Sequence, residues 1–358
     1  MRIGNNNEFK LTNMKINKII IGLAASAGLL ASCKNAPVVY PDFTYSAVYF
    51  ASQYPMRTVE LGEDLFVDNS LDNQRKVAIK ATIGGVYDNK KDVLVDVQVD
   101  ETLLNNLYFS NNGPKIVAMP TQYYKLASNQ IKIPAGSLLG GVEVQLTDAF
   151  FADPLALKAN YVIPLVMTKV TGADSILKGA KGVAIPSRLR PTDWLTPPKD
   201  YILYGVKYVN PWHGNYLRKG VDQITPVIGT PSTVVRHTPF VENNQAVNMT
   251  TASLQTANLA LSIKNSAGGT VPFTLVLTFA DNGTCTVTGN NPASFDITGT
   301  GKFVSKGEKN SIGGTDRSAI YLDYTVNFKN LNVNYATKDT LIVRDRGLKA
   351  EYFDVVIK

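Results

Sequence analysis

The sequence predicts an all-β protein of two domains, on three observations. After residue 38 most runs alternate apolar and polar residues with a period of two, the pattern of strands that bury one face. Clusters of Gly, Asn, Asp and Pro separate these runs, as turns do. The length of 358 residues fits about two domains.

The first predicted domain covers residues 38–172 and is expected to be an immunoglobulin-like β-sandwich. Its alternating runs keep one face polar, which suits antiparallel sheets that each show a face to water. About seven strands are expected, a number typical of this fold. The clearest runs lie at 76–83, 92–100, 131–133, 142–147 and 161–170.

Residues 173–200 are predicted to be a linker. They contain Pro186, Pro191, Pro197 and Pro198 and little alternation. Because proline cannot donate a backbone hydrogen bond, such a segment does not form a central strand.

The second predicted domain covers residues 201–358 and is expected to be an antiparallel meander closed into a lipocalin-like barrel, with a second β-sandwich as the alternative. The strongest hairpin prediction is at residues 281–284 (DNGT), because Asn-Gly tolerates the positive φ of tight turns. Strands are expected at 258–263, 271–280, 285–287, 295–303, 319–328, 340–344 and 352–357.

The N-terminus has the pattern of a lipoprotein signal peptide over residues 1–32, with Met14 as the expected start. Lys15 and Lys18 precede an apolar run at 19–30, and small residues lead directly to Cys33. The run is too short to span a bilayer. We therefore expect Cys33 to carry a lipid that anchors the protein to a membrane.

Composition excludes several functional classes. The chain has 36 basic and 29 acidic residues, and removal of residues 1–32 leaves 32 and 28, so nothing indicates a nucleic-acid partner. No nucleophile elbow, metal-ligand spacing or phosphate loop accompanies His213 and His237. We expect a non-catalytic protein with no metal and no cofactor. Cys285 is interpreted as a small buried hydrophobe.

Binding chemistry is better represented, because the apolar faces of sugar rings pack on aromatic side chains. The chain has 17 tyrosines and two tryptophans. Trp194 in the linker and Trp212, with Tyr208 and Tyr216 nearby, are the candidate carbohydrate-binding residues. For Trp212 the alternative is a core role at the base of a barrel. The triplet at 344–346 (RDR) is expected to form an ion-paired corner of the second domain.

Three short motifs carry a family resemblance: residues 131–136 (IKIPAG), 161–165 (YVIPL) and 206–216 (VKYVNPWHGNY). The chain resembles Bacteroidetes polysaccharide-utilisation surface lipoproteins. These have an N-terminal immunoglobulin-like domain of unknown function, also found ahead of secreted endoglycosidases, and a companion C-terminal all-β domain.

The resemblance implies an outer-membrane, lipid-anchored protein that binds an oligo- or polysaccharide beside a TonB-dependent transporter and companion lipoproteins. The cell surface is the expected location. Surface lipoproteins of this group often carry acidic residues after the lipidated cysteine, whereas Lys34 and Asn35 follow here, so the periplasmic face stays open. The alternative functions are a structural or assembly lipoprotein of an import complex and a glycoside hydrolase.

Overall fold

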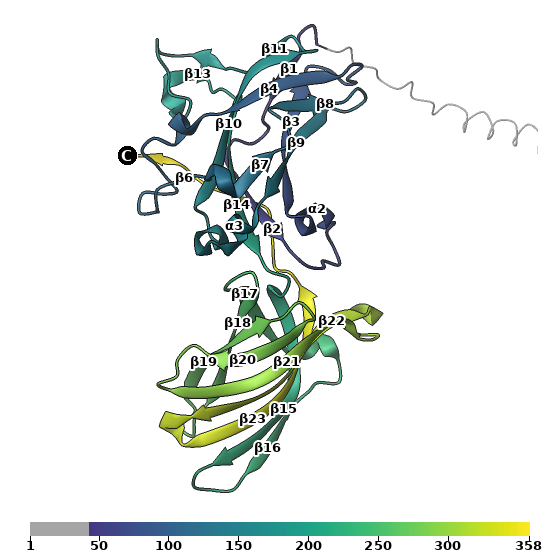
Figure 1. Cartoon of the computed structure of the whole chain (residues 1–358), viewed down its shortest axis with the longest axis vertical. Coiled ribbons are helices and arrows are strands. Elements are labelled where there is room, and N and C mark those ends of the chain that lie inside the picture. The colour runs from purple at the N-terminus through teal and green to yellow at the C-terminus, as the bar shows by residue number, and fades with distance from the viewer. Residues whose placement is uncertain (1–42) are drawn as a thin grey trace, which may run out of the picture. The chain divides into compact units, whose positions relative to one another are not determined.

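The computed structural model describes residues 43–358, of which Tyr45–Lys358 form one compact unit (Figure 1). The predicted signal peptide and Cys33 lie outside the described residues. The all-β prediction is confirmed, with a β-sheet-rich N-terminal domain and a closed antiparallel barrel in the C-terminal part. No helix in residues 43–358 has the length and apolar character needed to cross a bilayer.

The N-terminal domain is built on one large sheet, which has 12 strands within the described residues. In order across the sheet they are β11 (Ser175–Ile176), β1 (Ala47–Tyr49), β3 (Lys76–Gly84), β9 (Leu139–Leu146), β8 (Gln130–Ile133), β4 (Val93–Val99), β10 (Tyr161–Thr171), β14 (Tyr201–Val209), β2 (Pro55–Glu60) and β24 (Glu351–Tyr352), with β6 (Val117–Ala118) on β10 and β7 (Tyr124–Leu126) on β9.

This sheet closes over its own core in the manner of a sandwich. β8 and β9 share a single residue pair, Lys132 with Gly141, and the strands on either side of that junction bury their facing side chains in one cluster. The predicted alternation appears in β3, where Val77, Ile79 and Ala81 are buried while Lys80 is exposed. Period-two patterning therefore identified these strands from sequence.

Two central strands are buried on both faces. In β10 the run from Tyr161 to Met167 is buried throughout, and β14 beside it is nearly so. One face contributes to the core already described and the other to a second cluster that includes Val162 and Leu203. Residues 201–209 are predicted from sequence to belong to the second domain. That assignment is wrong, because β14 pairs with β10 and β2.

Short elements connect the strands of the described chain. Two pairs stand apart from the large sheets: β12 (Ala180–Lys181) with β13 (Trp194–Thr196), and β5 (Leu107–Tyr108) with β25 (Val356–Ile357). The short helices are α2 (Ser70–Asn73), α3 (Asp148–Ala152), η1 (Glu101–Leu104), η2 (Thr121–Tyr123), η3 (Pro154–Leu157), η4 (Pro191–Asp193), η5 (Val241–Asn243), η6 (Ile312–Gly314) and η7 (Lys329–Leu331).

The C-terminal barrel is a meander in which nearly every strand pairs with its neighbour in sequence (Figure 1). Pairing of the first long strand with the last one closes it, from Asn215 with Asp345 to Pro226 with Val333. Closure confirms the barrel and not the alternative sandwich. Its strands are β15 (Gly214–Pro226), β16 (Ser232–Arg236), β17 (Gln245–Thr251), β18 (Thr256–Lys264), β19 (Thr270–Phe279), β20 (Thr284–Gly289), β21 (Phe295–Glu308), β22 (Arg317–Phe328) and β23 (Val333–Asp345).

The hairpin predicted at 281–284 is present. Gly283 adopts φ +79°, and the amide of Ala280 donates to the carbonyl of Thr284 at 2.8 Å. The prediction that a strand at 352–357 forms part of the barrel is wrong. After β23 the chain leaves the barrel, and β24 and β25 pair with β2 and β5 of the N-terminal domain.

Candidate ligand site in the barrel

The interior of the barrel is layered. At the end where β15 begins, apolar side chains fill it, and Trp212 stacks on Phe279 with ring centroids 3.9 Å apart. Tyr216 and Leu341 belong to the same cluster. Toward the β15–β16 hairpin the inward positions become charged or polar. The barrel therefore has a plugged end and a polar end.

A network of ion pairs crosses the polar part of the barrel. Arg218 Nε donates to Asp339 Oδ2 at 2.8 Å, and their side chains are 6% and 0% exposed. Arg236 donates one Nη to Asp339 and the other to Asp222. Buried charges are tolerated when they are paired and hydrogen-bonded, and these four neutralise one another.

Two hydroxyl groups complete the network. Tyr324 Oη donates to Asp339 Oδ2 at 2.9 Å and accepts from Arg218 Nη2 at 3.2 Å. Thr337 Oγ1 donates to Asp222 Oδ1 at 2.8 Å. Each oxygen of the two carboxylates thus has at least one partner. Burial moves the pKa of Tyr324 well above its usual range, so the phenol stays protonated.

Gly220 makes the network sterically possible. It lies opposite Asp339 on β23 and opposite Arg236 on β16. A Cβ at this position would stand 2.3 Å from Asp339 Oδ1 and 3.0 Å from Arg236 Nη2. The absence of a side chain is what lets the Arg236–Asp339 pair cross β15.

Beside the network lies a cavity of about 380 Å³. Small-molecule sites usually span about 300–1,000 Å³, so the volume suits a small ligand. One wall is aromatic: the rings of Phe273 and Phe328 lie 5.3 Å apart, and those of Phe328 and Tyr335 lie 5.2 Å apart. The lining also includes Arg218, Asp222 and Arg236 from the network.

The barrel wall is interrupted beside this cavity. β17 and β18 pair only from Met249–Leu259 to Thr251–Ala257, and β16 pairs with β15 alone among the described strands. Val234 and Arg236 from one edge and Ser262 and Lys264 from the other line the cavity. The backbone wall of the barrel is therefore incomplete beside the cavity.

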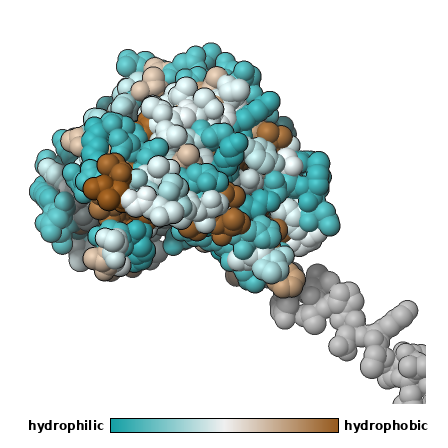
Figure 2. All heavy atoms as spheres, turned by 90° about the horizontal axis from the view of Figure 1, so that it is seen from below, coloured by the Kyte–Doolittle hydropathy of each residue, from teal (hydrophilic) through white to brown (hydrophobic). Residues whose placement is uncertain are grey.

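The hairpin end of the barrel presents a mixed surface. Viewed from below, as Figure 2 shows it, the molecule is mostly hydrophilic with a few separate apolar patches. Val227 and Ile228 at the β15–β16 turn are 76% and 93% exposed. Apolar side chains of this kind suit the rim of a site for a partly apolar ligand.

The sequence-predicted aromatic residues do not line this cavity. Trp212 is 9% exposed and plugs the barrel, and Tyr216 Oη donates to the Trp212 carbonyl at 2.7 Å. Tyr208 lies in the core of the N-terminal domain, where its hydroxyl donates to the Phe151 carbonyl at 2.7 Å. Trp212 and Tyr216 are thus buried in the barrel core and Tyr208 in the N-terminal core, while their predicted role in sugar binding stays a prediction.

Trp194 lies apart from the other three, in β13 of the linker. It is half-buried, and its indole N–H donates to the Ser187 carbonyl at 2.8 Å. Leu195 beside it is 80% exposed. Part of the Trp194 side chain is open to solvent, and Trp194 does not line the barrel cavity.

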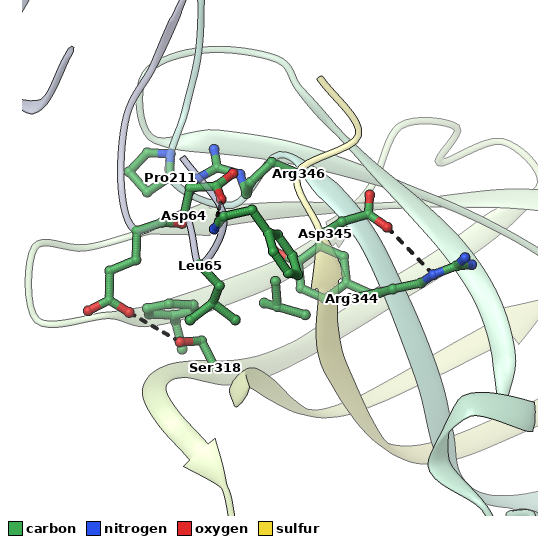
Figure 3. Close-up of a pocket in the computed structure, with 12 residues that line it drawn as sticks. Asp64, Leu65, Pro211, Ser318, Arg344, Asp345 and Arg346 are labelled. Carbon is green, nitrogen blue, oxygen red and sulfur yellow. Dashed lines mark hydrogen bonds and ion pairs between the residues drawn. The ribbon is translucent and has the colours of Figure 1, made fainter. Parts of the chain in front are cut away.

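A second cavity lies against the other end of the barrel, where the loop after β2 meets it (Figure 3). Glu63 accepts from Ser318 and Ser305, and Arg344 pairs with Asp345 at 3.5 Å. The space is only about 20 Å³, room for a water molecule or two. The residues around this space pack closely against one another, and the space is too small for a sugar.

Arg346 makes many of the hydrogen bonds between the loop after β2 and this end of the barrel. Its guanidinium donates to the carbonyls of Leu61, Glu63, Asn210 and His213 at 2.7–3.1 Å. It also lies 3.5 Å from Glu60 Oε1. The corner predicted at 344–346 is therefore ion-paired, although Arg346 serves mainly to bind backbone carbonyls of the loop after β2 and of the segment between β14 and β15.

Of the groups considered for reactivity, Cys285 is buried, His213 is partly buried and His237 is exposed. Cys285 is free, and burial raises its pKa to about 12, so it is an inert thiol as predicted. Burial lowers the pKa of His213 to about 4, and its Nδ1 accepts from the Thr251 amide at 3.3 Å. Within residues 43–358 no cluster of three or more His, Cys, Asp or Glu has metal-binding geometry.

Comparison with known proteins gives the family. A domain of unknown function (DUF5627) matches residues 211–347, the barrel, and a second family model, described as an N-terminal domain, matches residues 42–174. A crystal structure of a protein of unknown function from Bacteroides ovatus is 51% identical, with a TM-score of 0.82, and the match covers 88% of this chain and 100% of that one. The chain belongs to the family of that Bacteroides protein.

More distant Bacteroides structures share less with this family member. A multidomain protein including DUF1735 from Bacteroides ovatus is 14% identical, with a TM-score of 0.40 over 87% of this chain and 100% of that one. An auxiliary nutrient binding protein from Bacteroides thetaiotaomicron is 14% identical, with a TM-score of 0.36 over 80% and 90%. Neither likeness is close enough to assign a ligand. No curated protein matches the chain.

Proposed function

We propose that this protein is a non-catalytic, lipid-anchored glycan-binding protein of the cell envelope, and that its ligand binds in the barrel cavity. The observation that carries the proposal is the cavity itself: about 380 Å³, lined both by aromatic rings in edge-to-face contact and by hydrogen-bonding Arg and Asp side chains. Sugars require this combination, because their rings have apolar C–H faces and hydroxyl edges.

The rest of the proposal rests on the sequence. The signal pattern before Cys33 favours a lipid anchor, and the resemblance to polysaccharide-utilisation lipoproteins favours the outer membrane, the cell surface and a TonB-dependent transporter with companion lipoproteins as partners. Cys33→Ala should abolish incorporation of labelled palmitate into the protein and release it from the membrane fraction. An unlabelled wild-type protein would contradict the anchor.

Binding is tested by calorimetric titration of the detergent-solubilised full chain with oligosaccharides from plant and host polysaccharides. We expect saturable binding that is lost in Tyr335→Ala, which removes one ring of the aromatic wall, and kept in Trp194→Ala, which alters an aromatic residue outside the cavity. Binding that depends on Trp194 and not on Tyr335 would move the site to the linker. Co-purification of a transporter without any glycan binding would favour the assembly function, and sugar release over time would favour a hydrolase.

A further inference from the structure

The charges that face the barrel cavity are unbalanced, although the network behind it is neutral. Arg218, Arg236 and Lys264 line the cavity, and Asp222 is the single carboxylate among its lining residues in the described chain. Asp339, the other acid of the network, lies beneath them with a fully buried side chain. A ligand in the cavity therefore meets three cations and one anion.

The hydrogen-bonding groups of the network that remain without a partner are mainly donors. The oxygens of Asp222 and Asp339 already accept from Thr337, Tyr324 and the two arginines. A guanidinium has five N–H groups. Arg236 uses one N–H on each Nη and keeps one more on each, while its Nε is buried without a partner. Arg218 Nη1 has only a long bond of 3.4 Å to Gln245. Unused donors outnumber unused acceptors at this wall.

Position makes these charges effective. Arg218 is nearly buried and Arg236 about four-fifths so, which limits screening by water and salt. Lys264 stands exposed at the unpaired edge of β18, where its Nζ donates to Thr270 Oγ1 at 2.6 Å. An incoming anion would pass the lysine before it reaches the arginines.

Resting on the proposed function, we infer that the ligand is an acidic saccharide. Its anionic group binds at the Arg236 side of the cavity near Arg218, and its ring packs on the wall formed by Phe273, Phe328 and Tyr335. Guanidinium groups bind planar carboxylates in bidentate fashion and also bind sulfate esters. The shared chemistry is a sugar that carries one fixed negative charge, and a neutral sugar of the same shape leaves the excess donors unused.

The test compares matched ligands on the full wild-type chain. Short hexuronic-acid oligosaccharides are titrated beside the same oligosaccharides after carboxyl reduction, and sulfated oligosaccharides beside their desulfated forms. We expect the anionic member of at least one pair to bind roughly tenfold to a hundredfold more tightly. That preference should shrink in Lys264→Gln by about two- to threefold, since the rim charge is partly screened.

Arg236→Gln should abolish the preference, with thermal unfolding measured alongside. Arg344→Gln is the matched control. Arg344 lies on β23, does not line the barrel cavity, and pairs with the partly exposed carboxylate of Asp345. Equal binding of the charged and neutral members of both pairs overturns the inference and leaves glycan binding intact. Absence of binding by all members overturns both. The wild-type comparison decides the matter even if Arg236→Gln fails to fold.

Discussion

Arg218 and Asp339 form an ion pair inside the barrel, with Nε and Oδ2 2.8 Å apart and neither side chain appreciably exposed. The pair separates the apolar plug around Trp212 from the cavity beyond it. Replacing a buried ion pair by apolar residues is often neutral or stabilising, so the network is not explained by stability alone. The proposed ligand site would account for a charged network at this depth.

Removal of one partner should be costly. In Asp339→Asn the two arginines lose their shared counter-charge, and we expect the free energy of unfolding to fall by about 3 kcal/mol. Asp323→Asn on the same sheet is the control, because Asp323 is exposed and lies 3.4 Å from Lys338, and it should change stability by less than about 1 kcal/mol. Urea denaturation measures both, and equal effects would show that the network does not hold the barrel.

Gly220→Ala should disturb the network without altering any charge. The added methyl group would overlap Asp339 Oδ1 and the Lys338 carbonyl, each 2.3 Å from an ideal Cβ. We expect a loss of about 1–3 kcal/mol in stability together with a loss of glycan binding. Gly141→Ala in β9 is the matched strand control, with its nearest neighbour at 3.2 Å. Unimpaired binding in Gly220→Ala would argue against the network as part of the site.

Trp212→Ala separates the two interpretations of that residue. The side chain stacks on Phe279 in the barrel plug, so its removal should cost about 3–5 kcal/mol. Trp194→Ala should cost markedly less, because Trp194 is only half-buried. Thermal unfolding of the two variants tests this. A Trp212→Ala protein of wild-type stability that lost sugar binding would restore Trp212 as a ligand residue.

Stability should respond to pH through two groups beside Arg346 that act in opposite directions. Burial raises the pKa of Glu60 to about 7, so between about pH 4.5 and 7 the folded state holds a proton that the unfolded state has lost, and stability falls as pH rises. Burial lowers the pKa of His213 to about 4, so between about pH 4 and 6.5 the unfolded state holds the extra proton, and stability rises with pH.

From pH 4.5 to 6.5 the two effects largely cancel in the wild-type protein, each being on the order of 2 kcal/mol. Glu60→Gln should therefore show stability that increases with pH over this range, and His213→Asn stability that decreases. Denaturant midpoints at several pH values provide the measurement. Identical slopes in the wild type and Glu60→Gln would mean that Glu60 titrates normally in the folded protein.

Sequence patterning predicted most of the strands, because amphipathic strands repeat with period two and turns carry Gly, Asn and Pro. It placed β14 in the wrong domain. A strand buried on both faces, such as Tyr201–Val209, shows a continuous apolar run without alternation, and the run does not indicate which neighbours it pairs with.

The site was missed for a related reason. Arg218, Gly220 and Asp222 lie on the same face of β15 as the buried Tyr216, so period-two reasoning places charges on a core face. On β23, Thr337 and Asp339 likewise lie on the same face as the buried Leu341. This pattern was available as an indication of an internal polar site. The pairing of the two strands, which depends on closure of the barrel, was not.

Hydrogen–deuterium exchange of the wild-type chain, with and without a saturating oligosaccharide, shows where a ligand binds. β16 and residues 260–264 of β18 each have one unpaired edge, so their amides should exchange readily in the free protein. A ligand in the barrel cavity should slow exchange in these two segments and in Arg218–Ile224 of β15. Slowed exchange confined to residues 187–196 around Trp194, with the barrel unchanged, would contradict binding in the barrel cavity.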